Sequence, residues 1–477
     1  MTYLNDVDVT VLGPEFVGQP EVTAMLGAFY SRSYKPIKER LAELGSVEAV
    51  REKCRDTAVG YGHGSILDMA NFAVFVENVP ILAAVAFEDH ALFAGQETST
   101  RYVDWSTETF CNPQAPHTLQ AEALQAAYDL LRSTYTAVQR RVYERLTAAH
   151  SADPAAPPLT PIQQRAMRAR SFDVARGFLP AGAVTRFAWI TRGSAMKKHL
   201  RSLCNHPDLT IRIVARQVYE QLHASYPFAF EEPAKFNSRL VDERVVRAAY
   251  WPATSRYGAQ MVAPSLLYTN PGNAGSPGLL PAYDESVMRA CASRRKFDEL
   301  PPAVNMMAGT FTMDGTIDYG SFRDLNRHRR GQKFLPLPSS DSCLHPWYVK
   351  MSELTPRDVD RMNFVVRAYV AMCEDAYDAA YAVPMGTLVP VHYVTDLDQA
   401  VYLVERRTTI DVHPTLRMFM QGVGQQLRGW IDRSYSGQPT SRIAVHADQT
   451  PDPGMDGYVL VRGGQTFLVR GTQEESA

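Results

Sequence analysis

The sequence predicts an α+β protein made of two tandem copies of one domain, followed by a small β extension. Helix-like segments alternate with short β-branched runs along the chain. ARGFLP (175–180) resembles AAYAVP (379–384) at an offset of 204 residues. IRIVARQVYEQL (211–222) resembles LRMFMQGVGQQL (416–427) at an offset of 205. Because the offset is nearly constant, we expect an internal duplication. The expected domains are 1–235, 236–435 and 436–477.

In the first copy, alternating apolar residues predict strands, and apolar residues at every third or fourth position predict helices. The expected strands are 7–12, 71–80 and 184–191. The expected helices are 20–44, 79–95, 119–150, a segment that leads into ARGFLP, and 209–226. The proline-rich segment 153–161 ends the longest of these helices.

The second copy repeats this order of elements. A strand followed by a helix is expected over 310–330, a long helix over 358–384, a strand over 391–396 and a helix over 416–431. After them, RIAVHA (442–447) and residues 456–471 predict further strands, with a hairpin turn at Gly463-Gly464. This tail has no counterpart in the first copy.

Composition is that of a soluble globular protein, with 45% hydrophobic and 21% charged residues. The net charge of −2 gives no overall field for nucleic acid or an acidic membrane, so we expect neither as a partner. The six cysteines are scattered and predict neither a disulfide framework nor a metal site. No segment reads as a signal peptide or a membrane span, and a cytoplasmic location is expected.

Two short motifs could bind an anion. In ETSTRY (97–102), Glu97, Ser99 and Arg101 alternate, and a hydroxyl with a guanidinium suits a phosphate. A helix cap beside a surface arginine is the plainer alternative. In NRHRRG (326–331), a helix would place Arg327 and Arg330 on one face, with His328 and Arg329 elsewhere. Such a cluster could hold a pyrophosphate or a flavin edge, or form a solvated basic surface.

A third motif, GYGHGS (60–65), is rich in glycine but matches neither the Walker pattern nor the dinucleotide fingerprint. His63, Ser65 and Asp68 could still line a cofactor pocket. A structural turn is the alternative for this motif.

Together these motifs resemble the flavin-dependent thymidylate synthases (ThyX). That family carries Arg-His-Arg, then Ser-x-Arg ten to twelve residues later, and an upstream GH-x-[ST]-x-x-x-[ED] stretch. The first copy keeps Glu97, Ser99 and Arg101, together with GHGSILD (62–68), but has lost Arg-His-Arg. ARGFLP is similar to the family's A-R-Y-x-L-P and places its arginine at Arg176.

The second copy keeps the complementary residues. Arg327, His328 and Arg329 are intact, whereas Ser-x-Arg is lost. Arg407 lies ten residues before Arg417, the spacing of the family's catalytic arginine. In the family, active sites lie between subunits, and the losses in this chain follow that boundary. The resemblance therefore implies one composite site per chain, with random decay of both copies as the alternative.

The resemblance further implies two ThyX-like domains, each with an antiparallel sheet and long helices, and a homodimer of the whole chain. The implied reaction is FAD-dependent, methylenetetrahydrofolate-dependent methylation at C5 of a uracil nucleotide such as dUMP, with NADPH reducing the flavin. The alternatives are an enzyme that modifies another pyrimidine nucleotide, as in nucleoside modification or secondary metabolism, and a non-catalytic nucleotide-binding descendant.

The resemblance also implies a role for each motif residue. Glu97, Ser99, Arg101 and Arg176 would bind the nucleotide, and Arg407 would be catalytic. Arg327, His328 and Arg329 would clamp the flavin, with Arg327 near both ligands, while His63, Ser65 and Asp68 would line the cofactor side. Asp324 stands where the family has a glutamine near the base, so the base preference is open.

Overall fold

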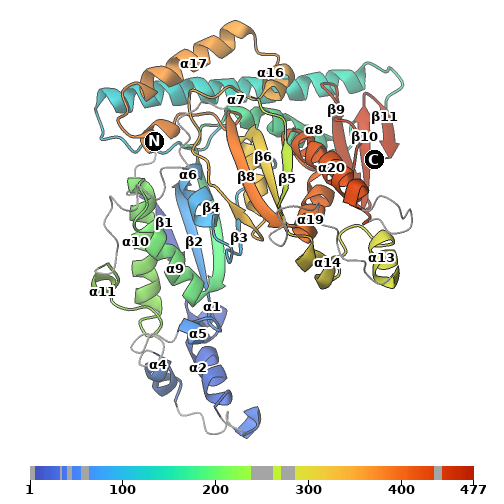
Figure 1. Cartoon of the computed structure of the whole chain (residues 1–477). Helices are drawn as coiled ribbons and strands as arrows, with labels where there is room; N and C mark the ends of the chain where they lie inside the picture. Colours follow the sequence, from blue (N-terminus) through green and yellow to red (C-terminus); the bar gives the residue numbers. More distant parts are fainter. Residues whose placement is uncertain are drawn as a thin grey trace. The chain divides into compact units, whose positions relative to one another are not determined.

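The computed structural model describes residues 6–32, 35–39, 46–54, 64–237, 261–269, 285–434 and 443–476. The chain divides into two compact units. Figure 1 shows the elements of both units, coloured along the sequence. The first unit comprises Met1–Thr98, Glu108–Pro116 and Gly182–Pro252, and the second comprises Ser99–Thr107, His117–Ala181 and Ala253–Ala477. The two units are defined by which residues pack together. The expected domain boundaries at 235 and 435 instead separate the two sequence copies and the tail, and these boundaries stay a prediction.

The first unit is built on a four-stranded antiparallel sheet in the order β1-β2-β4-β3. Its strands are β1 (Asp8–Val11), β2 (Asn71–Pro80), β3 (Gly95–Glu97) and β4 (Val184–Arg192). The helices α6 (Ile81–Glu88), α9 (Gly193–Leu203) and α10 (Leu209–Ser225) pack on this sheet. Phe72 of β2 contacts the rings of Tyr226 and Phe230 and so joins the sheet to the segment after α10.

Further helices belong to the first unit. They are α1 (Pro14–Val17), α2 (Pro20–Tyr30), α4 (Val47–Cys54), α5 (Gly64–Leu67) and α11 (Pro233–Asn237). The helix expected over 20–44 ends at Tyr30, and residues 40–45 lie outside the described residues. The helix expected over 79–95 ends at Glu88, because Gly95–Glu97 pairs with β4 as a strand.

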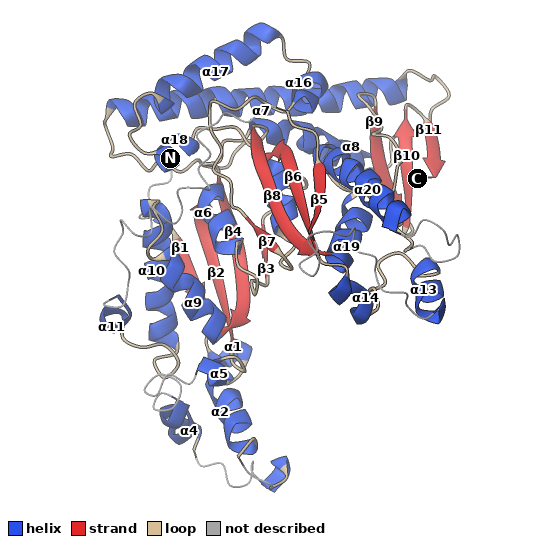
Figure 2. Cartoon of the chain, viewed as in Figure 1, coloured by secondary structure: helices blue, strands red, loops and turns tan. Residues whose placement is uncertain are grey.

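The second unit has a sheet with the same order, β5-β6-β8-β7 (Figure 2). Its strands are β5 (Ser265–Thr269), β6 (Thr310–Asp318), β7 (Gln332–Lys333) and β8 (Leu388–Asp396), and all pairs are antiparallel. The helices are α7 (Leu119–Ser151), α8 (Pro161–Ala175), α13 (Glu285–Ala292), α14 (Pro302–Met307), α15 (Tyr319–Asn326), α16 (Pro346–Ser352), α17 (Pro356–Val370), α18 (Ala376–Ala380), α19 (Leu397–Arg407) and α20 (Pro414–Ser434).

The repeated strand order confirms the tandem α+β fold. β4 and β8 are each nine residues long, and their first residues, Val184 and Leu388, lie 204 positions apart. Each is followed directly by a helix of 11 residues, α9 and α19. Length, order and offset therefore agree with the duplication that the sequence predicts.

Capping side chains set the starts of the helices that carry the site. Thr160 forms a capping box with Gln163 at α8, where Pro161 occupies the first turn. Asp318 accepts a hydrogen bond from Ser321 N at the start of α15, and Asp396 accepts one from Gln399 N at α19. Each carboxylate satisfies a backbone N–H that has no partner within its helix.

A helix expected over 358–384 is wrong, because two helices occupy that range. α17 ends at Val370, and α18 begins at Ala376 with Asp375 as its cap. Asp375 accepts a hydrogen bond from Tyr377 N, which starts a new helix in place of continuing the old one.

The small C-terminal sheet is present and has three antiparallel strands. β9 (Gly457–Arg462), β10 (Gln465–Arg470) and β11 (Gln473–Ser476) follow in order, and Gly463 and Gly464 form the first turn with φ of 60° and 78°. The strand expected over 442–447 is wrong for its described part, 443–447. Its backbone bonds to side chains: Arg294 donates to Ala444 O, and His446 N donates to Glu405. Within the described residues, no helix has the length and apolar character that crossing a membrane requires.

Candidate anion-binding site

A cavity of about 170 Å³ in the second unit has six arginines and two aspartates in its walls, and we call it the arginine pocket. The arginines are Arg101, Arg176, Arg323, Arg327, Arg406 and Arg407, and the aspartates are Asp324 and Asp411. Guanidinium groups carry their charge at all ordinary pH values. Cations therefore outnumber anions around this cavity, and it suits an anionic ligand.

Five of the residues expected to form a site line this one pocket: Ser99, Arg101, Arg176, Arg327 and Arg407. Ser99 and Arg101 lie in the loop after β3, and Arg176 follows the end of α8. Arg327 caps the C-terminus of α15, and Arg407 ends α19. The structure thus brings together motif residues from the two sequence copies.

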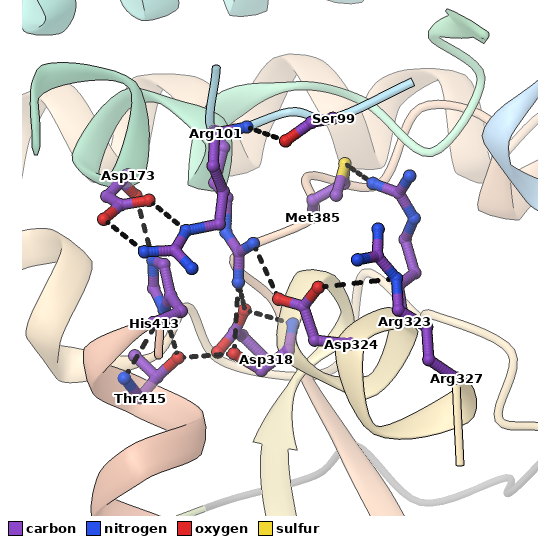
Figure 3. A network of polar contacts seen from close by, with 12 residues as sticks. Ser99, Arg101, Asp173, Asp318, Arg323, Asp324, Arg327, Met385, His413 and Thr415 are labelled. Carbon is purple, nitrogen blue, oxygen red and sulfur yellow. Dashed lines mark hydrogen bonds and ion pairs between the residues drawn. The ribbon is translucent and has the colours of Figure 1, made fainter. Parts of the chain in front are cut away.

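Arg101 is held by a bidentate ion pair with Asp173 (Figure 3). Its Nε and Nη2 donate to the two carboxylate oxygens at 2.5 and 2.9 Å, and Nη1 donates to Asp411 O at 3.0 Å. Burial acts to lower the pKa of Arg101, but the Asp173 carboxylate raises it above its usual range. Arg101 N also donates to Ser99 Oγ at 3.2 Å, which fixes the loop.

Arg176 is buried and held from several sides. Its Nη1 donates to Asp324 Oδ2 at 3.1 Å, Nη2 to Ser321 Oγ at 3.2 Å and Nε to Tyr348 Oη at 3.3 Å. The Asp318 carboxylate lies 3.9 Å from Nη2. Burial acts to raise the pKa of Asp324, yet Arg176, Arg327 and their neighbours lower it below its usual range, so this carboxylate stays ionised.

Arg407 is oriented by a neutral histidine. Its Nε donates to His328 Nε2 at 2.6 Å, and Nη2 donates to Asp324 O at 2.6 Å. Burial and the charge of Arg407 lower the pKa of His328 to about 2, so the imidazole can accept this bond at neutral pH. Within the described residues Nη1 of Arg407 makes no hydrogen bond, which leaves that nitrogen available to a ligand.

Arg327 and Arg406 are the most accessible cations of the pocket. Each side chain is 44% exposed, and their carboxylate contacts are long: Arg327 Nε lies 4.0 Å from Asp324, and Arg406 Nη1 lies 3.7 Å from Asp411. Exposed pairs of this kind contribute little to stability, so an incoming anion can compete for both guanidinium groups.

The helical placement expected for NRHRRG is wrong, because α15 ends at Asn326. Arg327 is the cap, and the chain then turns through Gly331, whose φ of 107° excludes continued helix. Arg329 does not line the arginine pocket. Arg330 instead pairs with Asp396 at 2.8 Å and Asp398 at 2.7 Å.

The remaining expected residues lie in the first unit or outside the described residues. Glu97 ends β3 and is buried, while Ser65 and Asp68 are exposed. Asp68 accepts a hydrogen bond from Ser194. His63 lies outside the described residues. The cofactor contacts of these residues stay predictions.

Several residues in the pocket or next to it were not expected from the sequence, and of these Asp173 does not line the pocket itself. Asp173 holds Arg101, His413 Nε2 contacts Asp173 O at 3.0 Å, and Arg323 and Arg406 add positive charge to the walls. Arg323 lies in α15 four residues before its cap Arg327, about one helical turn away, and Arg406 adjoins Arg407, so their spacing could have indicated both. Asp173 and His413 gave no comparable signal, because tertiary contacts alone bring them to the pocket.

Residues 19–228 match the family model described as thymidylate synthase complementing protein. Among curated proteins, the chain is 26% identical over 280 residues to UPF0159 protein Ta1429 of Thermoplasma acidophilum, covering 53% of this chain and 55% of that protein. It is 22% identical over 329 residues to a UPF0159 protein of Chlamydia muridarum, covering 60% of this chain and 61% of that protein. The chain therefore spans little more than half the length of these relatives.

A UPF0159 protein of Chlamydia pneumoniae is 22% identical over 413 residues, which cover 77% of this chain and 76% of that protein. Among solved structures, the chain is similar to the UMP/dUMP methylase PolB of Streptomyces cacaoi, bound with 5-Br dUMP. The identity is 18% and the TM-score 0.33, over 50% of this chain and 97% of that one.

Proposed function

We propose, from the match of residues 19–228 to the thymidylate synthase complementing protein family, that the chain methylates C5 of a uracil nucleotide. The observation that supports the proposal most is the arginine pocket. Motif residues that are incomplete in either sequence copy line one cavity there. A nucleotide has the phosphate that such a cationic pocket selects.

The accessible arginines would bind the phosphate. Arg327 and Arg406 are half exposed and weakly paired, and the hydroxyl of Ser99 lies in the same wall. Arg101 and Arg176 already bind carboxylates closely. They would therefore contribute charge and rigidity to the wall more than direct phosphate contacts.

Arg407 would stabilise negative charge that develops on the pyrimidine ring. His328 and Asp324 O fix two of its nitrogens, and Nη1 remains for the substrate. A preorganised cation of this kind acts where charge develops in the transition state and typically contributes about 10²–10³ in rate. His328 is then a positioning residue, because it holds Arg407 without having to touch the substrate.

The family resemblance supplies the finer statement that reduced FAD and methylenetetrahydrofolate take part, with NADPH as the reductant. A flavin would supply the reducing chemistry when bound. The arginine pocket by itself does not fit a flavin, because about 170 Å³ is well below the roughly 300 Å³ at which cofactor pockets begin. Of the three residues expected to clamp the flavin, only Arg327 lines it.

A second candidate is methylation of a different pyrimidine nucleotide. Asp324 is an ionised carboxylate in the pocket wall and can only accept hydrogen bonds. Such a group favours a base edge that presents N–H donors. Cytosine offers an exocyclic amino group, while uracil offers a single ring N–H, so a cytosine nucleotide is the alternative substrate.

Calorimetric titration with dUMP, UMP and dCMP, followed by a methyl-transfer assay with methylenetetrahydrofolate, FAD and NADPH, tests the proposal. We expect a uracil nucleotide to bind, and Arg407→Ala to lower turnover by about 10²–10³. Arg361→Ala on the exposed surface of α17 is the matched control and should retain full turnover. Full activity of Arg407→Ala would reject its assigned role. Binding of dCMP alone would favour the second candidate, and binding of no nucleotide would reject both.

A further inference from the structure

A second cavity, of about 500 Å³, lies in the second unit between α8, the segment before α20, and the C-terminal strand β9. We call it the C-terminal cavity. It shares Arg101, Tyr102, Asp411 and Val412 with the arginine pocket, so the two cavities are neighbours. Its volume falls within the range of pockets that hold a ring-sized organic ligand.

The mouth of this cavity exposes apolar side chains from three separate segments. Tyr102 is 68% exposed, Val461 of β9 is 55% exposed and Ile162 of α8 is 38% exposed. Single exposed apolar residues are ordinary, but three that surround one cavity form a binding surface. A tyrosine face favours an aromatic partner.

Charge in the walls favours an anion. Five arginines and three aspartates line the cavity. Four of the arginines already contact carboxylates: Arg101 contacts Asp173, Arg170 contacts Asp452, Arg417 contacts Asp448 and Arg462 contacts Glu474. Arg165 is exposed and makes no hydrogen bond or ion pair with the described part of the chain. Its guanidinium is the cation most available to a ligand.

The walls are fixed before any ligand arrives. Arg170 Nη2 donates to Asp452 Oδ2 and to Gly454 O, both at 2.9 Å, and so ties α8 to the segment before β9. Arg417 Nε donates to Thr408 O at 2.6 Å and Nη2 to Asp448 at 3.2 Å, which ties α20 to residues before it and after it. A preformed cavity spends little free energy on ordering its walls when a ligand binds.

We propose that the C-terminal cavity binds a flat aromatic molecule that carries an anionic group. The ring lies among Tyr102, Ile162 and Val461, and Arg165 binds the anion. Since Tyr102 borders both cavities, a molecule bound here adjoins one bound in the arginine pocket. This site depends on β9, which lies beyond the residues that match the family, and it does not require the proposed function to be correct.

Fluorescence titration of the full chain with FMN, and separately with folic acid, tests the site. Both probes are aromatic anions: FMN carries a phosphate and folic acid carries carboxylates. Comparing the two titrations therefore shows which kind of anionic group the site binds. We expect at least one probe to bind, and Val461→Glu and Arg165→Glu each to weaken that binding about tenfold or more. Phe364→Glu is the matched control, because Phe364 is 75% exposed and lines neither cavity.

Binding of dUMP is measured in the same variants, so that failure of this site and failure of the proposed function are distinguishable. Val461→Glu should retain the affinity of the wild type for dUMP. Three results would overturn the proposal: no binding of either probe, equal binding by all variants, or an equal loss of binding in Phe364→Glu. Circular dichroism of each variant shows whether it is folded, and Arg165→Lys, which keeps the charge, should restore most of the affinity.

Discussion

Pro180 and Pro384 face each other in an antiparallel bridge, and they are equivalent residues of the two sequence copies. On either side, Ala181 N donates to Val383 O at 2.9 Å, and Met385 N donates to Leu179 O at 2.8 Å. A segment that pairs with its own counterpart is the contact that two-fold symmetry produces between identical subunits. Here a fused pair makes this contact within one chain, close in sequence to Arg176.

This bridge predicts that Gly386→Ala destabilises the chain. A Cβ at Gly386 would lie 2.8 Å from Gly177 O and 2.9 Å from Tyr348 Cδ2, and the carbonyl cannot move away without losing the hydrogen bond that it accepts from Gly386 N at 2.8 Å. Overpacking of this kind costs about 1–3 kcal/mol. Urea denaturation measures the loss. Gly429→Ala in α20, where the nearest atom is a mobile Arg433 nitrogen, is the control and should be neutral or slightly stabilising.

Asp324→Asn should lower the free energy of unfolding by about 3 kcal/mol, because it leaves Arg176 buried without its full charge partner. The side chains of Arg176 and Asp324 are only 1% and 14% exposed, so water compensates little. Thermal denaturation measures the change. Asp360→Asn, on the exposed surface of α17, should have almost no effect. Equal stability of Asp324→Asn and the wild type would show that the pair contributes nothing.

Local sequence patterns predict most of the fold. The strand expected over 71–80 has the bounds of β2, and the helix expected over 119–150 ends one residue early. Apolar periodicity is a local property, so it locates these elements without tertiary information. The strand wrongly expected at 443–447 fails because of tertiary contacts, which a local pattern does not contain. The segment has strand-like residues, but the side chains of Arg294 and Glu405 satisfy its backbone where a neighbouring strand was expected.

The candidate site could be predicted in part. Ser99, Arg101, Arg176, Arg327 and Arg407 were found because each occupies a fixed place in a motif. Asp173 could not be found in this way. It lies 72 residues from Arg101 in sequence, and only folding of the loop against α8 brings the pair together. Carboxylates that balance a cationic pocket are selected by position in space, so a single sequence gives no spacing rule for them.

The homodimer stays a prediction, and its mass is the simplest test. Light scattering should give twice the 53.2 kDa of the chain at micromolar concentration. The family resemblance implies an assembly of four domains with closed two-fold symmetry. Because each chain carries two such domains, two chains are enough to form it. A single species of 53.2 kDa across a hundredfold range of concentration would contradict it. Such a monomer could still contain the complete arginine pocket, because every residue that lines the pocket lies in one unit.

The chain should lose stability as pH falls below about 6.5. Burial lowers the pKa of His328 to about 2 and that of His206 to about 3, and it holds the pKa of His413 well below its usual range. Unfolded histidines bind a proton near pH 6.5, whereas these three stay neutral in the folded chain. Below that pH the unfolded state takes up more protons, so each of them lowers the free energy of unfolding by up to about 1.4 kcal/mol per pH unit. Above pH 6.5 the three histidines are neutral in both the folded and the unfolded state, and the effect vanishes.

Urea denaturation at pH 7.5, 6.5 and 5.5 measures how the free energy of unfolding changes with pH. Below pH 6.5 this change should be smaller in His328→Gln than in the wild type. Identical slopes for the two proteins would mean that His328 takes up its proton at the same pH in the folded and the unfolded chain, and would contradict the low pKa of His328.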